Sequence, residues 1–409
     1  MRGFLRIGGM MVLITCLCGA LMLTACQPAK APDKNGNPDT GDASAPPITG
    51  KIKAGFIYVG PVGDFGWSHA HEQSRQHVMK LFPWMESTYV ESVAEADAPR
   101  VIDRLVQEEH CDIVFTTSFG YMDSTIEAGK EYPNTLFMHC SGYKQAPNVG
   151  TYFAELYQMY YLNGLMAGAL TKSKKVGYVG AHPIPEVVRH INAFGLGLRE
   201  VNPDARVTVK WLFAWYDPAK ARDATEALIA EGCDVIAFTQ DSPAICEVCQ
   251  EYAARGKQVL TFGHYSPMQR FGQDAVVSGQ LVDWNGLYEE ILMRVHTKTW
   301  TNRDYWWLAK ERATLLGGEP DVPINPKFVE PLKAVTVKDP ILGPISVHDL
   351  ALKRLDQMRE PTVLFDPFTG PIKDQSGTLR LKPAERASMS MLLSMDWFLD
   401  NIDGTIPKN

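Results

Sequence analysis

From residue 51 onward, short apolar runs alternate with longer amphipathic runs. The short runs are rich in β-branched and aromatic residues and predict strands at 52–60, 86–93, 111–117, 135–141, 175–181, 206–214, 233–239 and 257–263. The segments between them, such as 98–110 and 218–232, place apolar residues at helical spacing. Strands that alternate with helices predict an α/β fold with parallel sheets covered by helices on both faces.

The strand pattern also repeats. A shift of 122 residues aligns CDIVFTTSF (111–119) with CDVIAFTQD (233–241), and GFIYVG (55–60) with GYVGAH (177–182). One offset shared by several strands predicts two similar Rossmann-like lobes, at 51–172 and 173–280. A further strand at 275–284 begins a long tail. We expect the tail, 281–409, to cross between the lobes and to contribute a multi-strand hinge and elements of both.

Ligands of open parallel sheets bind beyond the carboxyl ends of the strands, so two facing lobes predict a cleft lined by strand-end loops. The loop YVGPVGDFGW carries Phe65 and Trp67, two rings that we expect the other lobe and a ligand to cover. Under the repeat, Phe119 and Asp241 occupy equivalent positions at the mouths of the two lobes.

The first fifty residues differ from the rest. Arg2 and Arg6 precede an apolar run, which predicts a secretory signal peptide at 1–25, with a retained anchor helix as the alternative. LTAC resembles the bacterial lipobox, so we expect Cys26 to be lipidated and to attach the protein to a membrane. Residues 26–50 contain no aromatic residue after Cys26 and predict a flexible tether.

Charge and cysteine content exclude several classes of protein. The chain has 40 basic and 47 acidic residues, a formal net charge of −7, and its body carries no basic cluster. This argues against nucleic acid and anionic lipid surfaces as partners. With Cys26 lipidated and the signal peptide removed, five cysteines remain, an odd number that excludes a complete disulfide framework.

Several stretches together resemble the basic membrane protein family of substrate-binding lipoproteins, which serve ATP-binding-cassette (ABC) importers. They are GFIYVGPVGDFGWSHAHEQ, TTSFGYM, PIPEVVRHINAFGLGLREVNP, FAWYDPAK, TQDSP, DPFTGPIKDQSG and SMDWFLDNIDG. The resemblance covers essentially all of 51–405. It implies a type I periplasmic binding fold, a monomer outside the cytoplasm, a membrane permease as partner, and a purine base or nucleoside as ligand.

Trp67 and Phe119 are the candidates for stacking on a flat ligand, with packing in the lobe cores as the alternative. Asp241 would accept a hydrogen bond from a donor edge of the ligand. Gln240 would hydrogen-bond to an adjacent donor–acceptor pair of the ligand. Asp241 alternatively caps the helix that begins near Pro243.

Six further residues complete the candidate site. Asp64 either caps the helix that follows it or accepts from a ligand N–H. Phe65 and Trp215 are wall candidates, and Tyr121 either lines the wall or caps a helix. Tyr157 either closes the site or belongs to the core. Asp283, at the end of the late strand, is the last candidate.

An enzyme is the main rival hypothesis. Cys246 and Cys249 form a CxxC pair that would suit a thiol oxidoreductase, but they lie inside a helical pattern rather than at its start. No phosphate-binding glycine loop, HExxH helix or GxSxG motif occurs, and the histidines show no metal-ligand spacing. We therefore expect no catalysis, no cofactor and no metal. A sensor subunit and a receptor for another small molecule, such as a sugar, stay open as alternatives.

Overall fold

The computed structural model describes residues 50–360, 362–363 and 365–407, which belong to one compact unit. The expected signal peptide, Cys26 and almost all of the tether lie outside these residues. Among the described residues, no helix combines the length and the apolar character that crossing a bilayer requires.

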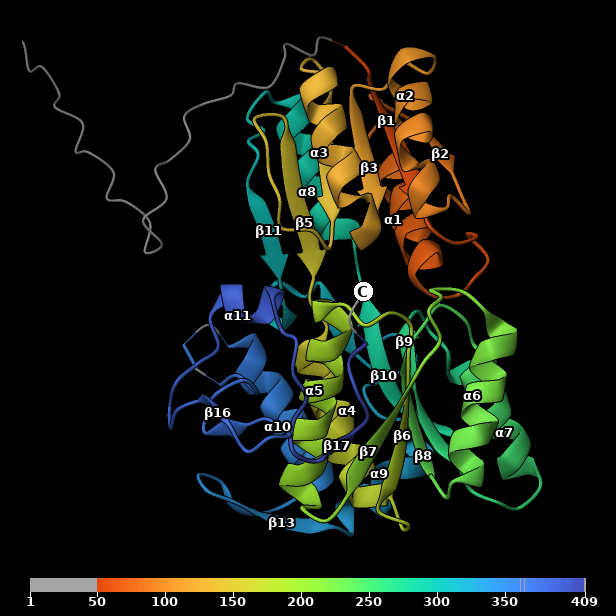
Figure 1. The fold of residues 1–409 in the computed structure, drawn as a ribbon, viewed down its shortest axis with the longest axis vertical. Coiled ribbons are helices and arrows are strands. Elements are labelled where there is room, and N and C mark those ends of the chain that lie inside the picture. The colour runs from red at the N-terminus through yellow and green to blue at the C-terminus, as the bar shows by residue number, and fades with distance from the viewer. Residues whose placement is uncertain (1–49, 361, 364, 408–409) are drawn as a thin grey trace, which may run out of the picture. The chain divides into compact units, whose positions relative to one another are not determined.

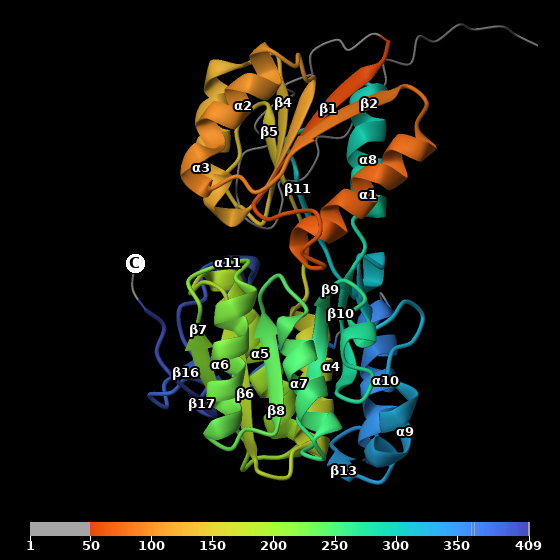
Figure 2. The ribbon, with the colours of Figure 1, turned by 90° about the vertical axis from the view of Figure 1, so that its right-hand side faces the viewer.

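The first sheet has six strands, all parallel (Figure 1). In spatial order they are β11 (Asp304–Trp307), β5 (Val149–Ala154), β4 (Leu136–Cys140), β3 (Ile113–Thr117), β1 (Ile52–Tyr58) and β2 (Met85–Val90). Two helices cover each face, as Figure 2 shows. They are α1 (Trp67–Leu81) and α8 (Asn285–His296) on one face, and α2 (Ala98–Gln107) and α3 (Met122–Glu131) on the other.

The second sheet has seven strands, parallel except for β12 at one edge. In spatial order they are β12 (Thr314–Leu316), β10 (Val276–Val282), β9 (Leu260–Tyr265), β8 (Val235–Thr239), β6 (Lys175–Gly180), β7 (Arg206–Trp211) and β17 (Ile402–Asp403). Its covering helices are α4 (Tyr157–Leu170) and α5 (Pro185–Val201) on one face, and α6 (Pro218–Ala230) and α7 (Ala244–Ala254) on the other (Figure 1).

Most of the remaining elements are short, and most of them pack around the second sheet. They are the helices α9 (Pro326–Lys333), α10 (Val347–Arg359) and α11 (Met389–Leu393), the paired strands β13 (Thr336–Asp339) with β14 (Gly343–Ser346) and β15 (Ile372–Lys373) with β16 (Leu379–Leu381), and the 3₁₀ turns η1 (Glu95–Asp97), η2 (Phe119–Tyr121), η3 (Gln269–Phe271) and η4 (Ala309–Glu311).

The predicted α/β fold with two parallel sheets is confirmed. The internal repeat is also visible in the strands, because β3 and β8 are both fully buried five-residue strands that start 122 residues apart. β9 differs from its prediction: it begins at Leu260 and runs to Tyr265. The helix before it ends at Ala254 and a loop follows, so the strand begins and ends later in the sequence than predicted.

Within the described residues the chain passes between the two sheets at three places, 155–156, 283–284 and 308–313. The first passage precedes α4, whereas the sequence reading placed the lobe boundary at residue 172. Helix α4 is buried on nearly all sides, and it packs against α5 on the second sheet. Its sequence is apolar on most sides, with Gln158 and Asn163 as exceptions, which fits a position between other helices rather than on a surface.

Glu155, in the first passage, links the passages to the second lobe. Its backbone N–H donates to the carbonyl of Trp307, directly before the third passage (2.8 Å). Its buried carboxylate accepts from Arg189 Nε (3.0 Å) and pairs with His190 Nε2 (2.9 Å), both on α5. Burial alone would raise the pKa of Glu155, but Arg189 and His190 lower it to about 2.

Candidate functional site

A pocket lies where the carboxyl ends of the two sheets face each other. It is small, about 20 Å³, which is room for about one water molecule. The lobes are therefore closed on each other, and a larger ligand enters only when the walls separate. The lining residues are Val59, Trp67, Ser118, Phe119, Ser141, Glu186, Trp215, Asp241 and Tyr265.

The lining residues come from equivalent places in both lobes. Ser118 and Phe119 follow β3, and Asp241 follows β8 two residues after its end. Trp215 lies in the loop after β7, and Tyr265 ends β9. This is the arrangement expected for a ligand site of open parallel sheets, because the strand-end loops converge there.

Trp67, the first residue of α1, has a fixed orientation. Its indole Nε1–H donates to the carbonyl of Thr117 (2.6 Å), at the end of β3. Its ring meets the ring of Tyr265 edge to face, with centroids 5.1 Å apart. Beneath it lie His71 and Trp284, whose rings are stacked 4.3 Å apart. The ring is thus held rigidly in the pocket wall, which favours stacking because little side-chain entropy remains to be lost.

Asp241 makes a contact across the cleft with only one of its two carboxyl oxygens. Oδ1 accepts from the backbone N–H of Trp67 (3.2 Å), whereas the buried Oδ2 has no hydrogen-bond partner within the described residues. Burial, and next the charge of Asp64, raise the pKa of Asp241 well above its ordinary value. A buried carboxyl oxygen without a partner favours a ligand that donates a hydrogen bond to it.

Glu186 supplies a second buried carboxyl group, from the first turn of α5. Ser141 Oγ donates to Oε2, and Tyr265 OH donates to Oε1 over 3.4 Å. Burial raises the pKa of Glu186 as well. Tyr265 itself has a left-handed backbone, with φ of 60°, a strained conformation that is common at functional sites.

The two lobes touch at Gly66, directly before Trp67. Ser266 Oγ donates to the carbonyl of Gly66 (3.3 Å), and a Cβ at Gly66 would lie 2.7 Å from Asp241 Cα. The close approach of the two backbones therefore requires a residue without a side chain at this position.

Phe65 is covered by the second lobe, as expected, but it does not line the pocket. Its ring packs against Phe271, with centroids 5.3 Å apart, and the guanidinium of Arg270 lies 4.5 Å from its centroid. Phe65 thus contributes to lobe contact outside the cavity.

The other predicted site residues lie outside the pocket lining. Asp64 accepts the backbone N–H groups of Gly66, Ser68 and His69, so it caps α1. Gln240 is adjacent to Asp241, but its amide donates to the carbonyl and hydroxyl of Ser242.

Three further candidates make hydrogen bonds outside the pocket: Tyr121, Tyr157 and Asp283. The Tyr121 hydroxyl donates to the carbonyl of Val93 (2.6 Å), and the Tyr157 hydroxyl donates to Asp366 (2.5 Å). Asp283 caps the first turn of α8 and lines a neighbouring groove. The structure thus brings together Trp67, Phe119, Trp215 and Asp241 of the ten sequence candidates.

Sequence reasoning missed four polar lining residues. Ser118 and Ser141 follow β3 and β4 directly, so the strand-end rule that singled out Phe119 would have found them. Tyr265 was missed because β9 ends later than predicted. Glu186 lies at a helix start, in the stretch PIPE, and only its place in the fold brings it to the pocket.

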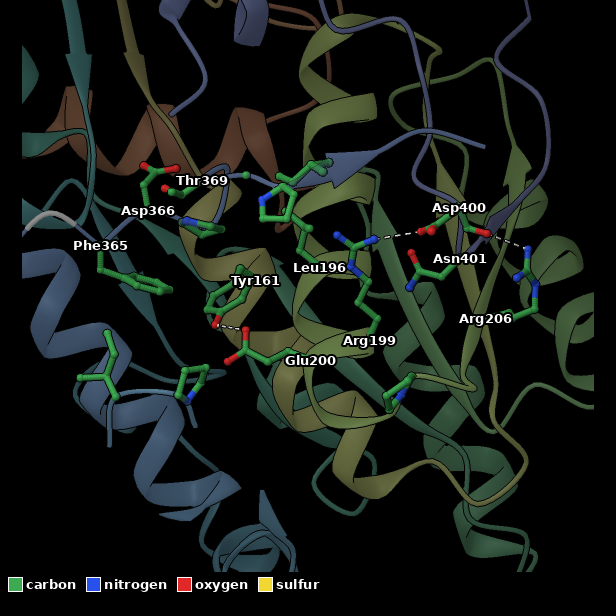
Figure 3. Close-up of a pocket in the computed structure, with 17 residues that line it drawn as sticks. Tyr161, Leu196, Arg199, Glu200, Arg206, Phe365, Asp366, Thr369, Asp400 and Asn401 are labelled. Atoms are coloured by element: carbon green, nitrogen blue, oxygen red, sulfur yellow. Dashed lines mark hydrogen bonds and ion pairs between the residues drawn. The ribbon is translucent and has the colours of Figure 1, made fainter. Parts of the chain in front are cut away.

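A wider groove of about 810 Å³ lies away from the cleft, between α5 and the C-terminal segment (Figure 3). Its charged groups have partners: Arg199 pairs with Asp400 (2.9 Å), Glu200 accepts from the Tyr161 hydroxyl (2.6 Å), Arg206 pairs with Asp403 (2.6 Å) and Asp366 with Arg386 (2.8 Å). These groups are already satisfied, so the cleft pocket, with its unpartnered Asp241 oxygen, is the candidate site.

Groups suited to redox or metal chemistry are not assembled in the described part of the chain. Cys246 and Cys249 are fully buried free thiols within α7, and burial raises the pKa of both. A buried neutral thiol is a poor nucleophile. No cluster of His, Cys, Asp and Glu residues among the described positions has metal-binding geometry.

Comparison with known sequences identifies relatives along most of the chain. Residues 51–338 match the family model Bmp, described as "ABC transporter substrate-binding protein PnrA-like". A purine-binding protein of Brucella abortus is 36% identical over 88% of this chain and 95% of its own length. A putative ABC transporter glucose-binding protein of Haloferax volcanii is 40% identical over 69% of this chain and 71% of its own length.

Solved structures with low sequence identity share the fold. An ABC transporter solute-binding protein from Aeropyrum pernix superposes with a TM-score of 0.65 at 15% identity, over 75% of this chain and 91% of its own. One from Conexibacter woesei superposes with a TM-score of 0.54 at 20% identity, over 77% of this chain and all of its own.

Proposed function

Because the chain belongs to the Bmp family of ABC-transporter substrate-binding proteins, which act outside the cytoplasm, we propose that it binds a purine base or nucleoside in the cleft pocket. Closure of the lobes would hold the ligand until the protein meets its membrane permease. The function is binding and delivery rather than catalysis.

The composition of the pocket wall is the observation that carries the purine proposal. Four aromatic side chains from both lobes surround the cavity: Trp67, Phe119, Trp215 and Tyr265. A planar heteroaromatic ligand gains from stacking on such rings, by roughly 0.5–1.5 kcal/mol per ring pair beyond burial. The unpartnered oxygen of Asp241 suits an exocyclic amino group or a ring N–H. The Brucella relative, matched over nearly its whole length, is named for purine binding.

A sugar is the second candidate, because the Haloferax relative is named as a putative glucose-binding protein. Aromatic rings and carboxylates also suit a sugar, so these residue types are compatible with both candidates. The two candidates differ in shape: a purine is flat on both faces, whereas a pyranose is puckered and carries hydroxyl groups around its rim.

The test identifies the ligand directly. Small molecules released from the denatured purified protein are analysed by mass spectrometry. Calorimetry then compares adenine, guanine, hypoxanthine, their nucleosides and glucose. We expect a purine to bind with a dissociation constant at least tenfold below that of glucose. Tighter binding of glucose would reject the purine assignment and leave the family assignment intact.

We also propose that Cys26 is lipidated and attaches the protein to the membrane through the tether. The support is the LTAC sequence after the apolar leader. The protein with Cys26→Ala should move from the membrane fraction to the soluble fraction while its calorimetric affinity is unchanged. Membrane retention of the variant would contradict lipid attachment through this residue.

A further inference from the structure

The carboxylate of Glu95 connects the two lobes at the pocket wall, although Glu95 itself does not line the pocket. It lies on η1 in the first lobe. Its Oε1 accepts from the hydroxyl of Ser118 (2.7 Å), in the same lobe, and from the indole Nε1–H of Trp215 (3.4 Å), in the second lobe. Ser118 and Trp215 both line the pocket, so one carboxylate oxygen joins opposite walls.

The first lobe holds this carboxylate against Gly120. A Cβ at Gly120 would lie 2.0–2.3 Å from the carboxyl carbon and both oxygens of Glu95. The carboxylate therefore packs against the backbone of the turn that carries Ser118 and Phe119. A side chain at Gly120 would displace it, although the charge of Glu95 would be unchanged.

Trp215 depends on contacts of this kind because its loop is exposed. The neighbouring aromatic residues Phe213 and Tyr216 are 56% and 40% exposed. Trp215 is partly buried, and its ring lies 4.8 Å from the ring of His182, in the same lobe. The Glu95 carboxylate is the hydrogen-bond acceptor for its N–H, and the bond links an exposed loop to the facing lobe.

We propose that Glu95 is a positioning residue that holds the Trp215 indole over the cleft pocket and thereby slows ligand release. A bond of 3.4 Å is long for N–H···O and has room to shorten when the indole packs on a ligand. A hydrogen bond to a charged group contributes enough to change the release rate roughly tenfold. The effect on release rests on the proposed function, whereas the position of Trp215 does not.

The first experiment needs no ligand. The protein is labelled with 5-fluorotryptophan, and the ¹⁹F resonance of Trp215 is assigned with Trp215→Phe. We expect Glu95→Ala and Gly120→Ala to shift and narrow this resonance, because both release the indole. Asp97→Ala is the control: Asp97 lies on the same 3₁₀ turn and is exposed. A Trp215 resonance that is the same in Glu95→Ala as in the native protein would overturn the proposal.

The second experiment measures release of adenine by stopped-flow fluorescence. Glu95→Ala and Trp215→Phe should each raise the dissociation rate roughly tenfold, and the double variant should be no faster than the faster single variant. Multiplied effects in the double variant would show that Glu95 acts independently of Trp215 and would overturn the proposal. If the native protein bound no purine, the proposed function would fail, and the ¹⁹F result would still decide the role of Glu95.

Discussion

The backbone N–H of Trp67 in one lobe donates to Oδ1 of Asp241 in the other, over 3.2 Å. The neighbouring N–H groups at the start of α1, those of Gly66, Ser68 and His69, are taken by Asp64. The Trp67 N–H is thus left for the facing lobe. One side chain thereby takes part in closure through Oδ1 and keeps a buried Oδ2 without a hydrogen-bond partner among the described residues, in a residue that lines the pocket.

Substitution of Gly66 should block closure. In Gly66→Ala the new Cβ would lie 2.7 Å from Asp241 Cα, which is too close for van der Waals contact with a backbone atom. Overpacking of this kind costs about 1–3 kcal/mol, so we expect ligand affinity to fall roughly 5- to 150-fold in calorimetry. Gly63→Ala is the matched control, because a Cβ there meets nothing within 4 Å. Equal affinities for the two variants would contradict this account of closure.

Phe119 can be tested with little risk to folding, because it is only partly buried. Phe119→Ala removes one stacking surface, and we expect affinity for the ligand to fall by about 0.5–1.5 kcal/mol or more, roughly 2- to 10-fold. Tyr143→Ala, an exposed aromatic residue outside the pocket lining, should leave affinity unchanged. Calorimetry at one pH suffices, and an unchanged affinity of Phe119→Ala would remove this residue from the site.

Closure without ligand should depend on pH. Burial and the charge of Asp64 raise the pKa of Asp241 above 3.8 in the closed form, whereas opening exposes it to water. The closed form therefore binds a proton more tightly, and raising the pH from about 4 to about 8 should favour opening. Small-angle X-ray scattering should show a radius of gyration that increases over this range.

Asp241→Asn tests whether ionisation of Asp241 causes this pH dependence. The amide oxygen can still accept from the Trp67 N–H, but the side chain no longer ionises. We expect most of the pH dependence of the radius of gyration to disappear, and Glu186 and Asp64, whose pKa values burial also raises, to account for the remainder. A pH dependence as large as in the native protein would show that Asp241 does not control closure.

The buried pair of Arg189 and Glu155 should matter for stability. Arg189→Ala leaves the buried Glu155 carboxylate with His190 and the backbone N–H of Tyr157 as its partners, and loss of one partner of a buried pair costs about 3–5 kcal/mol. Arg199→Ala, on the same helix, removes a partly exposed pair with Asp400 and should change the free energy of unfolding little. Urea unfolding of both variants decides between these expectations.

The acid dependence gives a second readout. The pKa of Glu155 is lowered to about 2 in the folded protein, so its ionisation stabilises the fold above the ordinary value of 4.5. This contribution is lost as the pH falls from about 5 toward 2. The difference in free energy of unfolding between the native protein and Arg189→Ala should shrink over that range, and a constant difference would contradict the ion-pair explanation.

The thiol pair in α7 should be inert. Cys246 and Cys249 are fully buried and their pKa values are raised, so iodoacetamide at about pH 8 should label neither in the folded protein. Both should react after unfolding in urea. Replacement of both by alanine should leave ligand affinity unchanged. Rapid labelling of the native protein, or loss of function in the variant, would revive the oxidoreductase hypothesis.

Local pattern was sufficient for the fold and for part of the site. Buried parallel strands are continuous apolar runs, and their repeat with a single offset pairs Phe119 with Asp241 from the sequence alone. Both residues line the pocket. The strand ends are therefore the part of a cleft that sequence alone predicts well, since each lies one or two residues after an apolar run.

Side-chain direction could not be predicted in the same way. Asp64 and Asp241 both follow strands and precede helices, yet one turns to its own helix and the other to the opposite lobe. The difference depends on how the two lobes meet. Glu186 and Glu95 lie outside strand ends, and only tertiary packing brings them to the site. Partners separated by many residues in the chain leave no local pattern.

The Glu155 cluster has a consequence for motion. It lies where the chain passes between the sheets, and its backbone is bonded to another passage at Trp307. Groups near the pivot of a rotation move least, so the lobes can swing apart while these paired charges stay dry and bonded. The equilibrium between the open and closed forms then depends on the few contacts between the lobes away from this pivot. A bound ligand can shift the equilibrium there.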